Sequence, residues 1–94
     1  MAKVIVQHHV EDYDRWLPVF KEHGEARRAN GATGHTVTRG VDDPNVVIIV
    51  NEFATAEGAK AFMIDPSLKE VMARAGVDSE PQVWIVEEAE SEKY

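Results

Sequence analysis

The sequence predicts an α+β domain whose elements follow one another in the order β-α-β-β-α-β. Short segments in which the side chains alternate between two faces, with a β-branched bias, predict strands, and longer segments with an apolar stripe at helical spacing predict helices. Turn-forming clusters separate these segments. The order is that of the split βαβ arrangement, in which two helical segments cover one face of a four-stranded antiparallel sheet. We expect residues 1–88 to form one domain and residues 89–94 to be an acidic, mobile tail.

The first strand is expected from Lys3 to Val10, because its side chains alternate between two faces. One face carries Val4, Val6, His8 and Val10, and the other carries Lys3, Ile5, Gln7 and His9. Asp12 is a suitable cap for the helix that follows, which we expect over residues 13–30. Since an interior proline removes a backbone hydrogen bond, we expect the first turn to be separate or kinked, with Pro18 starting the regular part.

The apolar stripe of this helix contains Tyr13, Trp16, Phe20, His23 and Arg27. The opposite side is expected to face water and carries Asp14, Lys21, Glu22, Glu25 and Arg28. Asn30 and Gly31 tolerate the left-handed conformation that ends a helix.

The second half of the chain is expected to contain two strands, a helical segment in two pieces and a final strand. Strands are expected at residues 35–39 and 46–53, joined at the turn cluster of residues 41–45. Thr55 is a cap for a helix that continues to Met63, and the Asp65-Pro66 pair then starts a second helical piece that ends at Gly76. The last strand is expected at residues 81–86.

The predicted sheet is apolar on both faces. The third strand places Val47 and Ile49 on one face and Ile48 and Val50 on the other. The last strand likewise has apolar residues on both faces: Val83 and Ile85 on one, and Trp84 and Val86 on the other. A sheet with one wet face should alternate apolar and polar residues, and two helices cover only one side. We therefore expect a homodimer packed sheet to sheet, with Trp84 at the interface, since Trp is enriched at interfaces. Such a dimer would also add burial to a short chain.

Composition excludes several classes of partner and site. The chain has 94 residues, no cysteine and a formal net charge of −7. The absence of cysteine excludes disulfides and thiolate metal sites. The negative charge, with no basic stripe, disfavours nucleic acid and anionic membranes as partners. Because the first residues lack a long apolar run, we expect a cytoplasmic protein.

Several motifs together are similar to those of one superfamily. They are Val-x-His-His-Val at residues 6–10, Tyr-Asp-x-Trp at 13–16, His23 with Arg27, and Asp-Asp-Pro-Asn at 42–45. With the βαββαβ order, the chain resembles the dimeric α/β-barrel superfamily. More narrowly, it resembles the small proteins grouped with antibiotic biosynthesis monooxygenases, some of which are labelled cyclases. The resemblance implies a ferredoxin-like subunit that dimerises into an α/β barrel, with a ligand cavity between sheet and helices.

The resemblance also implies roles for particular positions. A polar residue near the end of the first strand, often Asn in the relatives, faces the cavity, and His8 matches that place. Haem-degrading members carry a histidine on the second helix, but residues 56–75 contain none. The Trp common near the end of the third strand is Phe53 here. Haem ligation and the monooxygenase pattern are therefore matched only in part, and we predict no cofactor.

His8, His23 and Arg27 are the candidate catalytic residues. His23 and Arg27 stand four apart in an apolar stripe, where Leu or Ile is expected. In the functional interpretation, one histidine accepts a proton from a phenolic or enolisable substrate and Arg27 stabilises the oxyanion. In the structural interpretation, Arg27 reaches water near the helix end and His23 donates to a backbone carbonyl. Both interpretations stay open.

Trp16, Phe20, Asn51 and Phe62 are the candidate substrate-binding residues. The aromatic rings offer walls for a flat ligand, although aromatics at helical spacing are more often core. Asn51 interrupts the apolar third strand, where it offers a hydrogen bond to a ligand or pairs across the sheet. His35 and Arg39 share one face of the second strand and are expected at a solvated edge.

No metal site is predicted. His8 and His9 are adjacent on a strand and so point to opposite faces. The sequence thus predicts a homodimer that binds a small hydrophobic, aromatic or polyketide-like molecule, as a cofactor-independent monooxygenase or cyclase. The alternative is a non-catalytic ligand-binding or stress-associated dimer.

Overall fold

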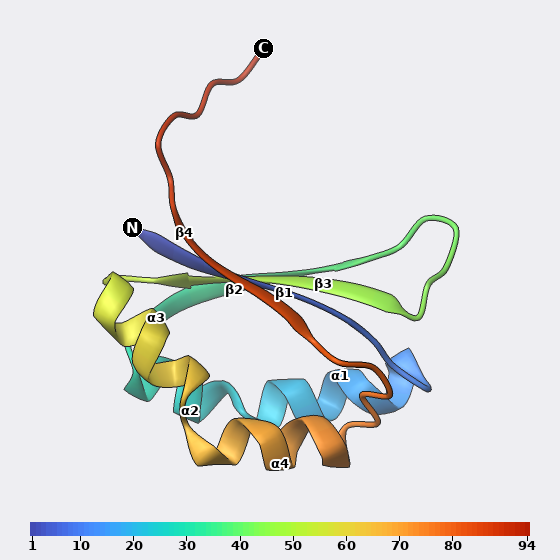
Figure 1. Ribbon diagram of the computed structural model, residues 1–94. Helices are drawn as coiled ribbons and strands as arrows, with labels where there is room; N and C mark the ends of the chain where they lie inside the picture. Colours follow the sequence, from blue (N-terminus) through green and yellow to red (C-terminus); the bar gives the residue numbers. More distant parts are fainter.

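The four strands of the chain form one antiparallel sheet, and all the helices lie on the same side of it (Figure 1). The computed structural model describes residues 1–94. The elements are β1 (Ala2–His9), α1 (Tyr13–Glu22), α2 (Gly24–Ala29), β2 (Ala32–Arg39), β3 (Val46–Phe53), α3 (Ala56–Met63), α4 (Pro66–Arg74) and β4 (Gln82–Glu87). The strand order is β2-β3-β1-β4. The predicted ferredoxin-like α+β fold is confirmed.

The alternation predicted for β1 is present. Ala2, Val4, Val6 and His8 are buried under the helices, while the residues between them are partly exposed. His8 and His9 therefore do lie on opposite faces. β3 alternates in the same way, and its pairing with β1 places Ile49 beside Val6 on the helix side.

Capping residues set the starts of the helices as predicted. The side chain of Asp12 accepts a hydrogen bond from the backbone N–H of Asp14, and that of Thr55 accepts one from Gly58. Asp65 accepts from Ser67 at the start of α4, where Pro66 takes the first helical position. None of the helices is long and apolar enough to span a membrane.

The expected single helix over residues 13–30 is wrong in one respect. The chain breaks into α1 and α2 at His23, and α1 continues through Pro18. Pro18 and Asp14, whose carbonyl loses its partner there, are both exposed, so water can satisfy that carbonyl. Gly24, a weak helix former, follows the break and is buried.

The second strand begins earlier than expected. β2 starts at Ala32, which pairs with Phe53, and the register shifts between Ala32 and Gly34. His35 and Arg39, which were expected at a solvated edge, are both exposed. Each also packs against an aromatic ring of α1. The His35 ring meets Phe20 edge-on, and the Arg39 guanidinium lies 3.9 Å from the centre of the Tyr13 ring.

The core lies between the sheet and the helices. It comprises Ala2, Val4, Val6, Val10, Trp16, Val47, Ile49, Phe53, Ala59, Phe62 and Ala75. Phe53 is completely buried, and its ring packs against Phe62. The helices cover the sheet unevenly, because Val83 and Ile85 of β4 remain 38% exposed although their register partners on β1 are buried.

The face of the sheet away from the helices is apolar at its centre. Ile5, Ile48 and Val50 lie there next to Trp84, which is 46% exposed. Nothing in the chain covers this face, and residues 88–94 extend away from the sheet on the same side (Figure 1). The prediction that both faces are apolar is therefore confirmed.

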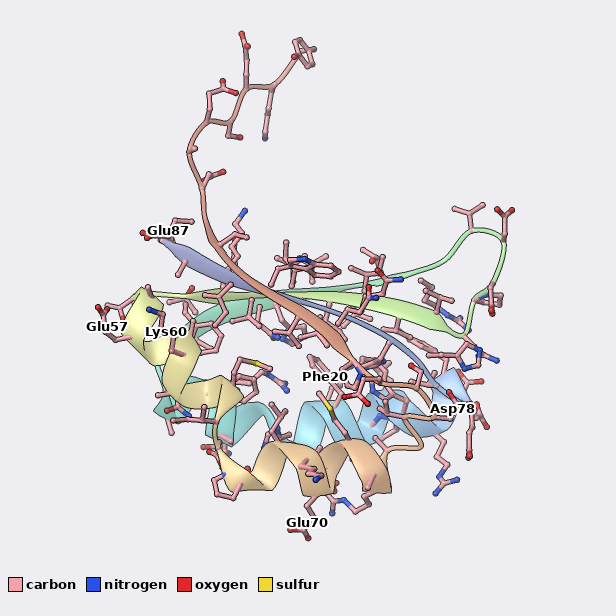
Figure 2. The ribbon with its side chains drawn as sticks, viewed as in Figure 1. Phe20, Glu57, Lys60, Glu70, Asp78 and Glu87 are labelled. Atoms are coloured by element: carbon pink, nitrogen blue, oxygen red, sulfur yellow. The ribbon has the colours of Figure 1, made fainter.

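His9 ties two loops to the end of β1. Its Nδ1 donates to Asp78 at 2.7 Å, and its Nε2 lies 3.7 Å from Asp43 in the β2–β3 hairpin. The backbone N–H of His9 also donates to the hydroxyl of Ser79. Figure 2 shows Asp78 at the end of the molecule where these loops meet. The hydrogen bond to Asp78 raises the pKa of His9 above its ordinary value.

Replacing His9 by glutamine is expected to destabilise the fold mainly below neutral pH. Because the folded pKa is raised, protonated His9 contributes stability that is fully present below the unfolded pKa and lost as pH rises through the folded pKa. The free energy of unfolding of wild type minus that of His9→Gln should thus be larger at pH 5 than at pH 9, as measured by urea unfolding. In the wild-type background, Asp78→Asn should remove the same pH-dependent part of the free energy of unfolding. In the His9→Gln background, it should remove no further pH-dependent part. An equal difference at both pH values would contradict the assignment.

Candidate functional site

A cavity lies between the sheet and the helices and is lined by all seven predicted site residues. They are His8, Trp16, Phe20, His23, Arg27, Asn51 and Phe62. β1 and β3 provide the roof through His8 and Asn51, and the remaining walls come from the helices. Figure 2 shows Phe20 in the layer between sheet and helices. The structure thus brings together residues up to 54 positions apart in the chain, from His8 to Phe62.

Two buried polar atoms at the roof have no partner on another residue. They are Nδ1 of His8 and Oδ1 of Asn51, in side chains that are 5% and 3% exposed. Buried polar atoms are nearly always hydrogen-bonded, because leaving one unpaired costs about 1–3 kcal/mol. The alternative in which the Asn51 side chain pairs across the sheet is not supported for its oxygen, which has no partner. Both side chains line the cavity, where a ligand with hydrogen-bonding groups would supply the partners that these atoms lack.

His8 is suited to accept a proton. Burial lowers its pKa below the ordinary value, so the imidazole is neutral at pH 7. The ring of Trp16 meets the His8 ring edge-on, with centroids 5.7 Å apart. The contact with Trp16 restricts the orientation of the His8 ring, and its Nδ1 has no partner on another residue.

His23 is held by α4. Its Nε2 lies 3.0 Å from the hydroxyl oxygen of Ser67, and its ring packs against Phe62. Burial, followed by the charge of Arg27, lowers the pKa of His23. The structural interpretation had His23 donating to a backbone carbonyl; its partner is instead the side chain of Ser67, 44 residues away.

Arg27 is buried to 5% exposure, and its guanidinium lies 3.8 Å from the centre of the Phe20 ring. It makes no ion pair, and its side chain donates no hydrogen bond to the protein. Burial is the main reason that its pKa falls to about 10. The group remains a cation at pH 7 and points a positive charge at the cavity.

The cavity itself is small. Its volume is about 40 Å³, whereas a buried hole that binds benzene measures about 150 Å³. The wall most open to movement is α4, in which no residue is fully buried. This wall consists of Leu68, Val71 and Met72, next to Met63 of α3. Since Met side chains adapt readily to irregular shapes, a ring can enter when this wall shifts.

Sequence reasoning missed the residues of the α4 wall and Ser67 as parts of the site. Leu68, Val71 and Met72 have only the helical spacing of apolar residues, which is typical of a core and does not mark a ligand site. Ser67 carried only the signal of a helix start, after Asp65-Pro66. No group of three or more His, Asp or Glu side chains is arranged to hold a metal ion.

Replacing Asn51 by leucine is expected to stabilise the protein and weaken ligand binding. Leucine has a similar shape and removes the unpaired oxygen, so the free energy of unfolding should rise by about 1–3 kcal/mol. Urea unfolding and ligand titration by calorimetry measure the two effects. Asn30→Leu is the control, because Asn30 already donates to the carbonyl of Ala26 and should lose stability. Destabilisation by Asn51→Leu would show that the oxygen has a partner.

Comparison with known proteins places the fold among solved structures. No protein-family model matches the sequence, and a comparison with curated proteins finds no significant match. The chain is similar to SnoaB, a cofactor-independent oxygenase from Streptomyces nogalater, with TM-score 0.75, 13% identity and coverage of 96% of this chain and 94% of that one. It is also similar to an antibiotic biosynthesis monooxygenase, with TM-score 0.71, 17% identity and coverage of 96% and 100%.

A third similar structure is a conserved protein from Methanosarcina mazei Go1, with TM-score 0.73, 15% identity and coverage of 94% and 92%. At such identities the likeness concerns the fold alone. The predicted resemblance is confirmed at that level: this chain has the fold of the antibiotic biosynthesis monooxygenase-like proteins.

Proposed function

We propose that this chain binds a small aromatic or polyketide-like molecule in the cavity and acts on it without a cofactor. The observation that carries this proposal is the pair of buried, unpartnered atoms, His8 Nδ1 and Asn51 Oδ1, in the same cavity as the unpaired cation of Arg27. A phenolic or enolisable ligand offers both the hydrogen-bond donor and the developing negative charge that these groups lack. The likeness to SnoaB, a cofactor-independent oxygenase, agrees with this chemistry.

The proposed reaction begins with proton transfer to neutral His8. The electron pair left on the substrate spreads onto an oxygen that Arg27 stabilises. In an oxygenation, dioxygen then oxidises a CH₂ group to C=O, and its second oxygen atom leaves as water with the two substrate hydrogens. In a cyclisation, the enolate carbon instead attacks a carbonyl carbon of the ligand, and the alkoxide that forms takes back the proton from His8. His23 holds the opposite wall through Ser67.

We also propose that the acting unit is a homodimer formed sheet to sheet. The support is the uncovered apolar face with Ile5, Ile48, Val50 and Trp84 at its centre. A dimer would remove these side chains from water and stabilise a chain of only 94 residues.

Native mass spectrometry combined with oxygen-uptake assays tests the function. Freshly purified protein should give the mass of two chains and retain any bound small molecule. Phenolic and enolisable compounds that raise the melting temperature should then be consumed with uptake of oxygen, or cyclised, in the presence of EDTA. Ligands that bind but are returned unchanged would favour the alternative of a non-catalytic binding or stress-associated dimer.

A further inference from the structure

A second hollow adjoins the cavity on the far side of Arg27. We call it the basic groove; it is lined by Lys21, Gly24, Arg27, Arg28, Ala32, Thr33, Gly34 and His35. Its volume is about 330 Å³, within the range of about 300–1,000 Å³ usual for ligand sites. Arg27 lines both the basic groove and the cavity and so forms the wall between them.

The basic groove has an unusual charge for this protein. The chain carries a formal charge of −7, yet four of the eight lining residues are basic or histidine and none is acidic. Only Arg28 has an ion-pair partner, Glu25. Lys21, Arg27 and His35 have no carboxylate within 4.0 Å.

Arg27 is the strongest of these signals. A guanidinium at 5% exposure normally has a carboxylate or several acceptors, because an unpaired buried charge is costly. Here its only close partner is the face of the Phe20 ring. Its nitrogens are not among the sealed, unpaired atoms of the protein, so they keep some accessibility, and the residue lines the open groove. An anion that enters from outside would supply the missing partner.

We propose that the basic groove binds the anionic group, carboxylate or phosphate, of a ligand whose aromatic part enters the cavity. The inference rests on the proposed function and specifies its ligand as an aromatic acid or phosphate ester. Arg27 forms a two-pronged contact with the anion, Lys21 adds a second positive charge, and His35 offers a ring N–H as a hydrogen-bond donor. The guanidinium lines both hollows, so it can hold this anion on one side and face the oxyanion in the cavity on the other.

Four small probes separate the ring from the anion: phenol, benzoate, phenyl phosphate and inorganic phosphate. Calorimetry on the full chain should give affinities for benzoate or phenyl phosphate at least about tenfold above that for phenol, as charge-assisted hydrogen bonds predict. The stronger of the two identifies the anion. Added salt should weaken the anionic probes and leave phenol unchanged.

Lys21→Gln tests the groove without touching the proposed catalytic groups. Because Lys21 is exposed, the variant should stay folded and lose about two- to fivefold in affinity for the anionic probe only. Lys60→Gln is the matched control, since Lys60 is an exposed lysine on α3 that does not line the groove. Equal losses in the two variants, or benzoate and phenyl phosphate no tighter than phenol, would overturn the anion site.

The pKa of His35 provides an independent readout by NMR. Burial, then the charges of Arg27 and Lys21, lower this pKa in the free protein. An anion in the basic groove should raise it, whereas phenol should not. An unchanged His35 pKa under saturating benzoate and phenyl phosphate contradicts the proposal. If phenol binds but neither anionic probe raises the His35 pKa, the proposed function stands and the anion site in the groove is refuted. If inorganic phosphate binds but no aromatic probe does, the anion site in the groove stands and the proposed function is refuted.

Discussion

Replacing His8 by glutamine is expected to lower kcat/KM by about 100- to 10,000-fold, the usual contribution of a general base. Glutamine is similar in size and keeps a hydrogen-bonding group at the roof of the cavity, so ligand affinity should change little. The wild-type rate should stay constant from pH 8 down to below pH 6.5 and fall only in more acidic solution, because burial lowers the pKa of His8 and the neutral form is the active one. Initial rates of substrate consumption across this pH range measure both effects.

His9→Gln is the matched control for that substitution. His9 is the next residue on the same strand, but it lies on the opposite face and bonds to Asp78. Its replacement should leave kcat/KM unchanged at pH 8. Full activity of His8→Gln would assign the proton transfer to another group, with His23 as the first to examine.

Replacing Trp84 by glutamate should turn the proposed homodimer into monomers. Trp84 is the largest exposed side chain on the uncovered sheet face. A central Trp at an interface commonly contributes about 2 kcal/mol or more, and a twofold axis counts the change twice, so the dissociation constant should rise about 1,000-fold. Sedimentation velocity over a dilution series measures the shift.

Val41→Glu is the control for Trp84→Glu, since Val41 is fully exposed in the β2–β3 hairpin. It should not change the dimer. A wild-type chain that stays folded as a single copy at micromolar concentration would refute the homodimer. The monomeric Trp84→Glu variant should also unfold at a lower temperature, because the free subunit is small.

Features set by local chemistry were predictable from the sequence. Asp12, Thr55 and Asp65 cap helices through short-range hydrogen bonds that depend only on neighbouring residues. The two-residue period of β1 assigns His8 to the buried face without any knowledge of its neighbours. The common cavity followed because those faces and the helix stripe had to meet across one layer.

Features that depend on how distant segments of the chain pack together were not predictable from the sequence. A helical projection over residues 13–30 placed Lys21 and Arg28 on a side facing open water. Both residues are exposed as expected, but they also line one groove beside the break at His23, which the projection did not predict. The wall of α4 and the contact of His23 with Ser67 depend on packing between segments 44 residues apart. No local pattern reports such a contact.

The exposed edge strand β4 has a consequence for colloidal behaviour. Its residues Gln82–Glu87 include four consecutive apolar side chains, all accessible, beside a free row of backbone hydrogen-bonding groups. Such a segment readily recruits copies of itself into fibrils. The glutamates at 87, 88, 90 and 92 follow directly and repel a second strand that approaches in register. This acidic segment should therefore protect β4 from aggregation. Replacing the four glutamates with glutamine should shorten the lag time of fibril growth measured by thioflavin fluorescence.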